Sequence, residues 1–144
     1  MILPISLTIA AGAALLNLWL AMRVGRVRMS ENVSIGDGGN ERLIRRMRAH
    51  GNYVENTPFV LILILLVEFV HGPSPWLWGA GVVYLVARIL HAFGMDGLGW
   101  ARMAGVVISM LTQLGLAVAA LTAVYLTPVG SLSASVTETV TVEE

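Results

Sequence analysis

The chain has no cysteine and no lysine, and only 12% of its 144 residues are charged. Without cysteine it can form no disulfide, and it offers neither a thiolate nucleophile nor a cysteine ligand for a metal or an iron–sulfur cluster. Any thiol in its chemistry must therefore come from a substrate. The formal net charge of zero argues against nucleic acid as a partner, because there is no overall positive field to attract phosphates. All nine basic residues are arginines, which reflects either genomic composition or the suitability of guanidinium for binding carboxylates.

Apolar surface is what the chain has in excess. Hydrophobic residues make up 56% of it and the mean hydropathy is +0.77, which is more than a soluble domain of this size can bury. Four apolar stretches each approach the roughly 20 residues that a helix needs to cross a bilayer. They predict an all-α membrane protein, a four-transmembrane-helix bundle in residues 1–127, with spans at about 2–22, 48–70, 76–93 and 101–126. The composition of residues 128–144 predicts a disordered tail.

The connections between these stretches predict the topology. Turns rich in glycine and proline at 71–75 and 96–99 predict two tight helical hairpins, and Asn40 is a candidate N-cap for the second helix. Every arginine lies near the connection between the first two spans or near the connection between the last two. By the positive-inside rule that side of the membrane is cytoplasmic, so we expect both termini on the outside.

Polar residues interrupt the second apolar stretch at helical spacing. Four of them share one side of the helix, at i, i+4, i+7 and i+8: Arg48, Asn52, Glu55 and Asn56. Glu55 lies about 10 Å along the axis from Arg48, at a depth where an unpaired charge costs at least a few kcal/mol. It needs a partner, and Arg88 in the third stretch is a candidate. Such a pair could be purely structural, or both side chains could contact a ligand.

A larger set of polar residues accompanies this stripe. Its seven members exceed what helix packing requires, and excess polarity inside a membrane usually marks a ligand or ion path: Arg48, His50, Asn52, Glu55, Arg88, His91 and Arg102. Arginine, asparagine and glutamate together suit a small zwitterion with carboxylates and an ammonium group. The histidines lack the spacing of metal ligands, so no metal centre is predicted. Glu68 is expected to be an interfacial residue, and Gln113 to form a packing hydrogen bond.

The run Arg48 to Phe59, RAHGNYVENTPF, resembles the signature R-A-H-x-N-x-x-E-x-x-P-F of the MAPEG family, the membrane-associated proteins in eicosanoid and glutathione metabolism. The spacing of the four spans and the run from Val83 to Arg88 match as well, so the resemblance covers about residues 1–127. It implies a bacterial-type protein of the cell inner membrane, multi-pass with both termini periplasmic. It also implies a homotrimer that binds glutathione between subunits at the cytoplasmic side and meets hydrophobic substrates in the surrounding lipid.

The resemblance assigns roles by position. Arg48, Asn52 and Glu55 would hold the glutathione backbone, with His50 at the same site, where relatives carry glutamine or histidine. Arg102 matches the arginine with which leukotriene-forming members stabilise the glutathione thiolate. That role is chemically sound, because a nearby guanidinium lowers a thiol pKa that is normally about 8.5. Further binding candidates are Asn56, Arg88, His91 and, as a first-helix arginine, Arg23.

The chain also departs from the family. His91 and Met95 replace two tyrosines of the eicosanoid synthases, Asn56 replaces a third, and Met103 follows Arg102 where the prostaglandin branch has serine. An eicosanoid is therefore not the expected substrate. The leading interpretation is a glutathione transferase or peroxidase acting on hydrophobic electrophiles. The alternative is a non-enzymatic trimeric membrane scaffold or small-molecule-binding protein; a transporter subunit is disfavoured because the sequence shows no internal repeat.

Overall fold

The computed structural model describes residues 2–126. It contains four helices, α1 (Pro4–Ser30), α2 (Glu41–His71), α3 (Pro75–Met95) and α4 (Gly99–Tyr125), and the described residues form no strand. All four helices are long and apolar enough to cross a membrane. The prediction of an all-α protein with four transmembrane helices is thus confirmed. The tail expected at 128–144 lies outside the described residues.

Local chemistry explains where the helices begin and end. Pro4 and Pro75 stand in the first turns of α1 and α3, where the missing N–H costs no helical hydrogen bond. The side chain of Asn40 accepts a hydrogen bond from the backbone N–H of Leu43 at 3.0 Å, so the expected N-cap of α2 is confirmed. Gly72 ends α2 with a φ of 73°, a conformation that glycine adopts without strain.

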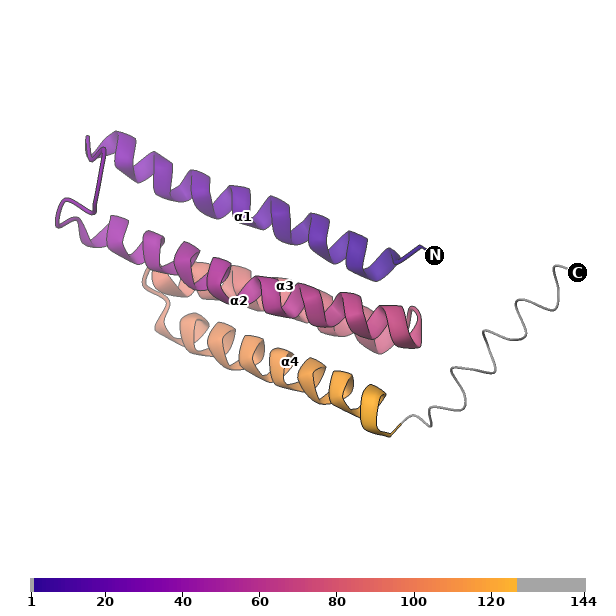
Figure 1. Ribbon diagram of the computed structural model, residues 1–144. Helices are drawn as coiled ribbons and strands as arrows, with labels where there is room; N and C mark the ends of the chain where they lie inside the picture. Colours follow the sequence, from indigo (N-terminus) through magenta and orange to yellow (C-terminus); the bar gives the residue numbers. More distant parts are fainter. Residues whose placement is uncertain (1, 127–144) are drawn as a thin grey trace, which may run out of the picture.

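Two of the helices continue well beyond their apolar parts. α1 runs on to Ser30 although its apolar stretch ends near Met22, and α2 begins at Glu41, ahead of the polar stripe. These extensions carry most of the arginines. We call the end of the molecule formed by residues 23–48 and 95–102 the arginine end. The N-terminus of α1, the connection 72–74 and the C-terminus of α4 form the opposite end (Figure 1).

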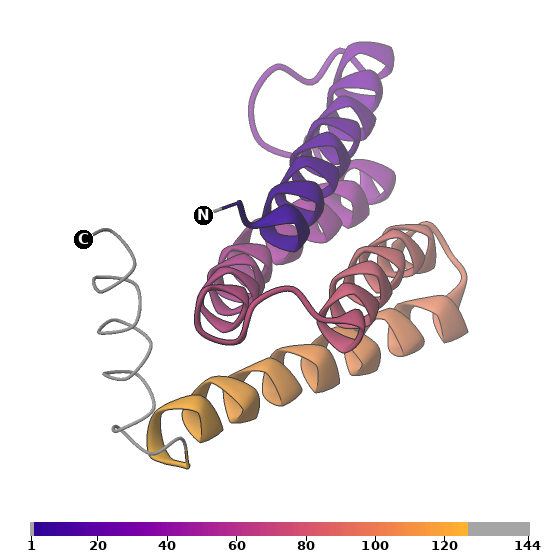
Figure 2. The ribbon, with the colours of Figure 1, turned by 90° about the vertical axis from the view of Figure 1, so that its right-hand side faces the viewer.

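The helices pack as two hairpins, α1 with α2 and α3 with α4 (Figure 2). α2 contacts all three other helices, whereas α1 and α4 do not contact each other within the described residues. α3 and α4 approach most closely because glycine stands at the contact. A Cβ atom on Gly105 would lie 2.6 Å from the carbonyl oxygen of Ala87, and one on Gly94 would lie 2.1 Å from the backbone nitrogen of Arg102. Neither position can hold a larger residue without the two helices separating.

Two apolar clusters form the core between the hairpins. The larger one, toward the opposite end, draws on all four helices and comprises Ile5, Ile9, Val60, Ile64, Val67, Leu77, Tyr84 and Leu116. The smaller one lies nearer the arginine end and comprises Ala13, Leu16, Leu20, Tyr53 and Ala92. Much apolar surface remains outside these clusters, as expected for helices that face lipid.

The structure corrects the prediction for Glu68. This residue is not interfacial but fully buried, with 0% of its surface exposed. Its carboxylate accepts hydrogen bonds from the backbone N–H groups of Ile5 at 2.9 Å and Ser6 at 2.7 Å, and from the Ser6 hydroxyl at 2.6 Å. These N–H groups belong to the first turn of α1, which has no helical acceptors for them, and a negative charge is favoured at that end of a helix. Glu68 is therefore an N-terminal cap supplied by another helix.

Candidate functional site

The polar stripe of α2 has an open side and a covered side. Ala49, Tyr53 and Thr57 recur at every fourth position and are buried against the other helices. Arg48 and Glu55 lie on the side of α2 turned away from that core, and both are exposed. Within residues 2–126 neither forms a hydrogen bond to another side chain or an ion pair. A cationic and an anionic group are thus available on one open face, which we call the Arg48–Glu55 face.

Asn52 belongs to the covered side and contacts the third helix. Its side-chain oxygen accepts a hydrogen bond from Nη2 of Arg88 at 2.8 Å, and its backbone oxygen accepts one from Nδ2 of Asn56, also at 2.8 Å. The ion pair considered between Glu55 and Arg88 does not form. Asn52 takes the place of Glu55 because the 100° rotation per residue turns position 52, rather than 55, toward α3. Of the stripe, only Asn52 and Asn56 are brought together with Arg88.

Arg88 is enclosed between α2, α3 and α4. Only 3% of its surface is exposed, its Nε has no hydrogen-bond partner, and its guanidinium carbon lies 5.7 Å from the centre of the Tyr53 ring. It borders a cavity of about 50 Å³, which has room for a few water molecules but not for a peptide. The cavity is lined by Asn52, Asn56, Arg88, Val106, Ser109, Met110 and Gln113. Gln113, expected to form a packing bond, instead helps to surround Arg88.

The two candidate histidines occupy different surroundings. His50 lies against α1, where its Nε2 is 2.9 Å from Oδ1 of Asn17. His91 is buried, and its Cβ atom would lie 2.8 Å from a Cβ atom placed on Gly105 of α4. Neither histidine lies on the Arg48–Glu55 face. Asn17 was not singled out from the sequence, although a lone asparagine in an apolar helix is a recognisable signal.

Arg102 lies in the first turn of α4, at the arginine end. Its side chain is exposed and has no hydrogen-bonding or ionic partner in the part of the chain that the structure describes. Its backbone is fixed, because it packs directly on Gly94 of α3. Arg102 and the Arg48–Glu55 face therefore lie at the same end of the molecule but on different hairpins.

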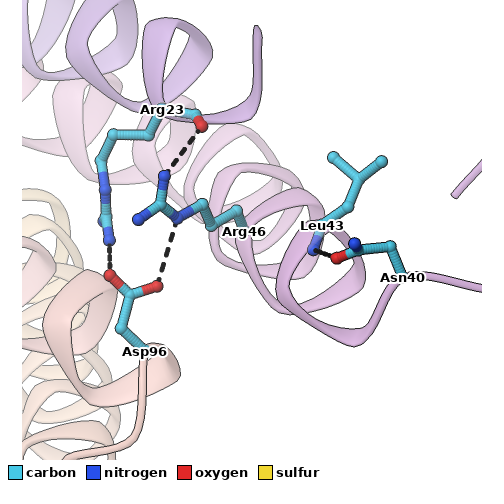
Figure 3. Close-up of polar contacts among 5 residues, drawn as sticks. All are labelled: Arg23, Asn40, Leu43, Arg46 and Asp96. Carbon is cyan, nitrogen blue, oxygen red and sulfur yellow. Dashed lines mark hydrogen bonds and ion pairs between the residues drawn. The ribbon is translucent and has the colours of Figure 1, made fainter. Parts of the chain in front are cut away.

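Arg23 is placed in a cluster of its own (Figure 3). It is 6% exposed and forms an ion pair with Asp96, and its guanidinium lies over the ring of Trp19 at 4.6 Å and that of Phe93 at 5.6 Å. Arg46 approaches the other carboxylate oxygen of Asp96 with Nε at 3.4 Å and donates to the backbone oxygen of Arg23 at 3.1 Å. We call Arg23, Arg46 and Asp96 the Asp96 cluster. Neither Arg46 nor Asp96 was expected at a site from the sequence, although an acid in a turn, within a chain rich in arginine, signals such a partner.

Comparison with known proteins adds to this geometry. Residues 6–122 match the MAPEG family. Two curated proteins, each named inner membrane protein YecN, from Escherichia coli strain K12 and Escherichia coli O6:H1, are 36% identical to this chain over 91 residues. The matched region covers 62% of this chain and 69% of each relative.

Proposed function

Because the chain belongs to the MAPEG family, we propose that it is an inner-membrane protein that binds glutathione on the Arg48–Glu55 face. Two relatives named as inner membrane proteins and four apolar helices of spanning length support the location. The distribution of arginines supports a cytoplasmic arginine end and periplasmic termini. Glutathione would then reach the protein from the cytoplasm.

The observation that carries this proposal is the pair of unpartnered charges on the open side of α2. Arg48 and Glu55 lie about 10 Å apart along the helix axis, which is within the span of a tripeptide. Glutathione carries two carboxylates and one ammonium group. The guanidinium of Arg48 suits a carboxylate, since its fork can donate two parallel hydrogen bonds, and Glu55 suits the ammonium. Asn52 is half-buried at the edge of this face, and because Arg88 engages only its side-chain oxygen, its amide NH₂ group is the part that would serve the ligand.

The same charges favour assembly. An ionised side chain that faces lipid within a membrane helix costs up to about 2.5–3.5 kcal/mol, so Glu55, which lies inside the span, requires cover from outside the subunit. We therefore propose a homotrimer in which a neighbouring subunit covers this face and encloses the ligand. The exposed apolar residues Val54 and Phe59 beside the stripe would contribute to that interface.

Arg102 would supply the chemistry. A guanidinium close to the glutathione sulfur stabilises the thiolate over the thiol, and the thiolate is the nucleophile. Attack of the thiolate on an electrophilic carbon forms a carbon–sulfur bond, and the leaving group departs with the electron pair of the bond that breaks. Hydrophobic electrophiles dissolved in the bilayer are the substrate class that the exposed apolar helices suit. Reduction of a hydrophobic peroxide by the same thiolate is the related peroxidase activity.

A second candidate function is a trimeric scaffold or binding protein without catalysis. It is favoured by the burial of His91 against α4 and by the use of Arg88 to hold Asn52 within one subunit. Both observations show candidate site residues engaged in packing within one subunit. The two candidates differ in whether bound glutathione becomes ionised.

Binding is tested by the thermal stability of detergent-solubilised protein titrated with glutathione. A ligand that binds only the folded protein stabilises it by about 2.7 kcal/mol at a hundredfold excess over Kd. S-methylglutathione is the matched probe, because it keeps the tripeptide charges but has no ionisable thiol. Stabilisation by both compounds supports the site on α2, and absence of any shift with either contradicts it.

A further inference from the structure

The two hairpins are joined differently at the two ends of the molecule. Toward the opposite end a large apolar cluster draws on all four helices. Toward the arginine end the apolar core is smaller, and polar contacts cross between the hairpins instead. Thr57 lies 3.0 Å from the Tyr84 hydroxyl, and farther along Arg88 donates to Asn52. The last crossing, at the arginine end itself, is the Asp96 cluster.

Asp96 makes this crossing with both oxygens of its carboxylate. It stands at the C-terminal cap of α3, where its own N–H bonds back to the carbonyls of Phe93 and Gly94. One oxygen pairs with Arg23 of α1 and the other with Arg46 of α2. Figure 3 shows the three residues closing a triangle, in which the contact between Arg46 and Arg23 goes to the backbone oxygen of Arg23. The two contacts of Asp96 therefore fix the position of the α3 terminus relative to both α1 and α2.

The start of α4 moves with Asp96. Only a short turn separates α3 from α4. In it the N–H of Gly97 donates to the carbonyl oxygen of Gly94, and the N–H of Gly99 donates to that of Gly97. Gly94 packs against the backbone of Arg102 so tightly that no Cβ atom would fit between them. Arg102 cannot shift along α3 without disrupting this contact. Whatever fixes Asp96 relative to α1 and α2 also fixes the backbone of Arg102.

We propose that Asp96 is a positioning residue that sets the placement of Arg102 relative to the Arg48–Glu55 face. The inference rests on the proposed function in one respect, because it takes Arg102 as the group beside the glutathione sulfur. Asp96 itself does not contact the ligand. It joins the hairpin that holds the tripeptide to the hairpin that holds the thiolate-stabilising arginine.

Electrostatics make this joint depend on the charge of Asp96. Its carboxylate separates two guanidinium groups, those of the buried Arg23 and of Arg46. Asp96→Asn would leave these like charges side by side with nothing between them, and Arg23 is held in place by Trp19 and Phe93. Because Arg23 and Arg46 both belong to the α1–α2 hairpin, what the joint loses is the attraction that holds the α3 terminus to each of them, and the two hairpins should separate at the arginine end. Arg23→Gln combined with Asp96→Asn replaces this ion pair with two neutral amides that can hydrogen-bond to each other, and should restore the spacing in part.

The spacing can be measured directly because the chain has no native cysteine. Met29→Cys in α1 and Met103→Cys in α4 replace two exposed methionines, and nitroxide labels on them report the distance between the hairpins. Labelled protein is diluted with excess unlabelled protein to suppress distances between subunits. Asp37→Asn is the matched control, since Asp37 lies in an exposed loop and caps only Gly39.

The second measurement is the thiol pKa of bound glutathione, read from the thiolate absorbance. We expect Asp96→Asn to lengthen or broaden the label distance and to raise the thiol pKa toward about 8.5, with roughly tenfold less thiolate for each unit. The glutathione Kd should stay within about threefold of wild type, because Arg48, Asn52 and Glu55 remain. The double variant should recover part of both changes, and Asp37→Asn should alter neither.

The outcomes separate this inference from the proposed function. If wild-type protein binds glutathione and Asp96→Asn changes neither distance nor thiol pKa, Asp96 is not a positioning residue. A changed distance with an unchanged thiol pKa likewise overturns the link to Arg102. If wild-type protein binds no glutathione, the proposed function fails. The distance alone then decides whether Asp96 joins the hairpins, and an unchanged distance rejects that as well.

Discussion

Two glutamates of helix α2, Glu55 and Glu68, are separated by about three and a half turns and have opposite surroundings. Glu68 is fully buried and all its hydrogen bonds go to the first turn of α1. Glu55 is exposed and has no partner among the residues that the structure describes. The comparison shows that charge inside a membrane helix does not by itself identify a binding site. The informative property is whether the fold satisfies the charge within one subunit.

Arginines follow the same division. Arg23 and Arg88 are buried and engaged, the first by Asp96 and the second by Asn52. Arg48 and Arg102 are exposed and free of partners within residues 2–126. The engaged residues hold helices together, and the unengaged ones remain for a ligand or a second subunit. Five experiments test this division.

The largest expected effect is on Glu68. Glu68→Ala leaves the N–H groups of Ile5 and Ser6 buried without acceptors, at about 1–3 kcal/mol each, so we expect several kcal/mol of lost stability. Thermal unfolding in detergent measures it. Glu55→Ala, the same change on the open face, should leave the unfolding temperature near wild type. Equal destabilisation by the two variants would abolish the distinction between the glutamates.

Glu55→Gln should affect binding rather than folding. A hydrogen bond to a charged group contributes about 1.5–3 kcal/mol, so loss of the ammonium contact should weaken glutathione binding by about tenfold or more. Titration calorimetry measures the affinity, and size-exclusion chromatography checks that assembly is intact. If assembly is lost instead, Glu55 has a structural role like that of Glu68.

Substitutions of Arg48 and Arg102 should separate binding from ionisation. Arg102→Leu should return the thiol pKa of bound glutathione toward about 8.5 and reduce the thiolate roughly tenfold per unit, while leaving the affinity mostly intact. Arg48→Leu should instead lower the affinity for glutathione, because it removes the group proposed to bind a carboxylate. Thiolate absorbance near 240 nm follows both variants. A wild-type protein that binds glutathione without lowering the thiol pKa would favour the scaffold over the enzyme.

A smaller effect is expected at Ser6, the partner of Glu68. Ser6→Ala removes one of the three hydrogen bonds to the carboxylate but keeps the two from the backbone, so about 0.5–1.5 kcal/mol of stability should be lost. Thermal unfolding again provides the measurement. The glutathione affinity should not change, because Ser6 lies at the opposite end from the Arg48–Glu55 face. A changed affinity would show that the two ends are coupled.

The mildest perturbation is a reporter fused after Glu144, which replaces no residue of the protein. With a cytoplasmic arginine end, a reporter that is active only after export should be active. Glu55 would then lie in the cytoplasmic half of the bilayer and Glu68 in the periplasmic half. A reporter that is active only in the cytoplasm would reverse this assignment and remove the route proposed for glutathione.

Four features could be predicted from the sequence alone: the four helices, the N-cap at Asn40, the family and the polar stripe of α2. These depend on local quantities: hydropathy over about 20 residues, the 3.6-residue period of a helix and the cap chemistry of single residues. The signature of charged residues at fixed offsets lies within one helix, so its recognition required no knowledge of packing.

The pairing of the polar groups, by contrast, depends on how the helices pack. The tertiary structure pairs Arg88 with Asn52 rather than Glu55, buries Glu68 under the first turn of α1, and places Asp96 between two arginines. Each pairing joins helices far apart in the sequence and depends on how each helix is rotated and where it crosses its neighbour. A rotation of 100° per residue makes adjacent positions face different helices, so a sequence pattern can establish that a charge needs a partner without establishing which partner it finds.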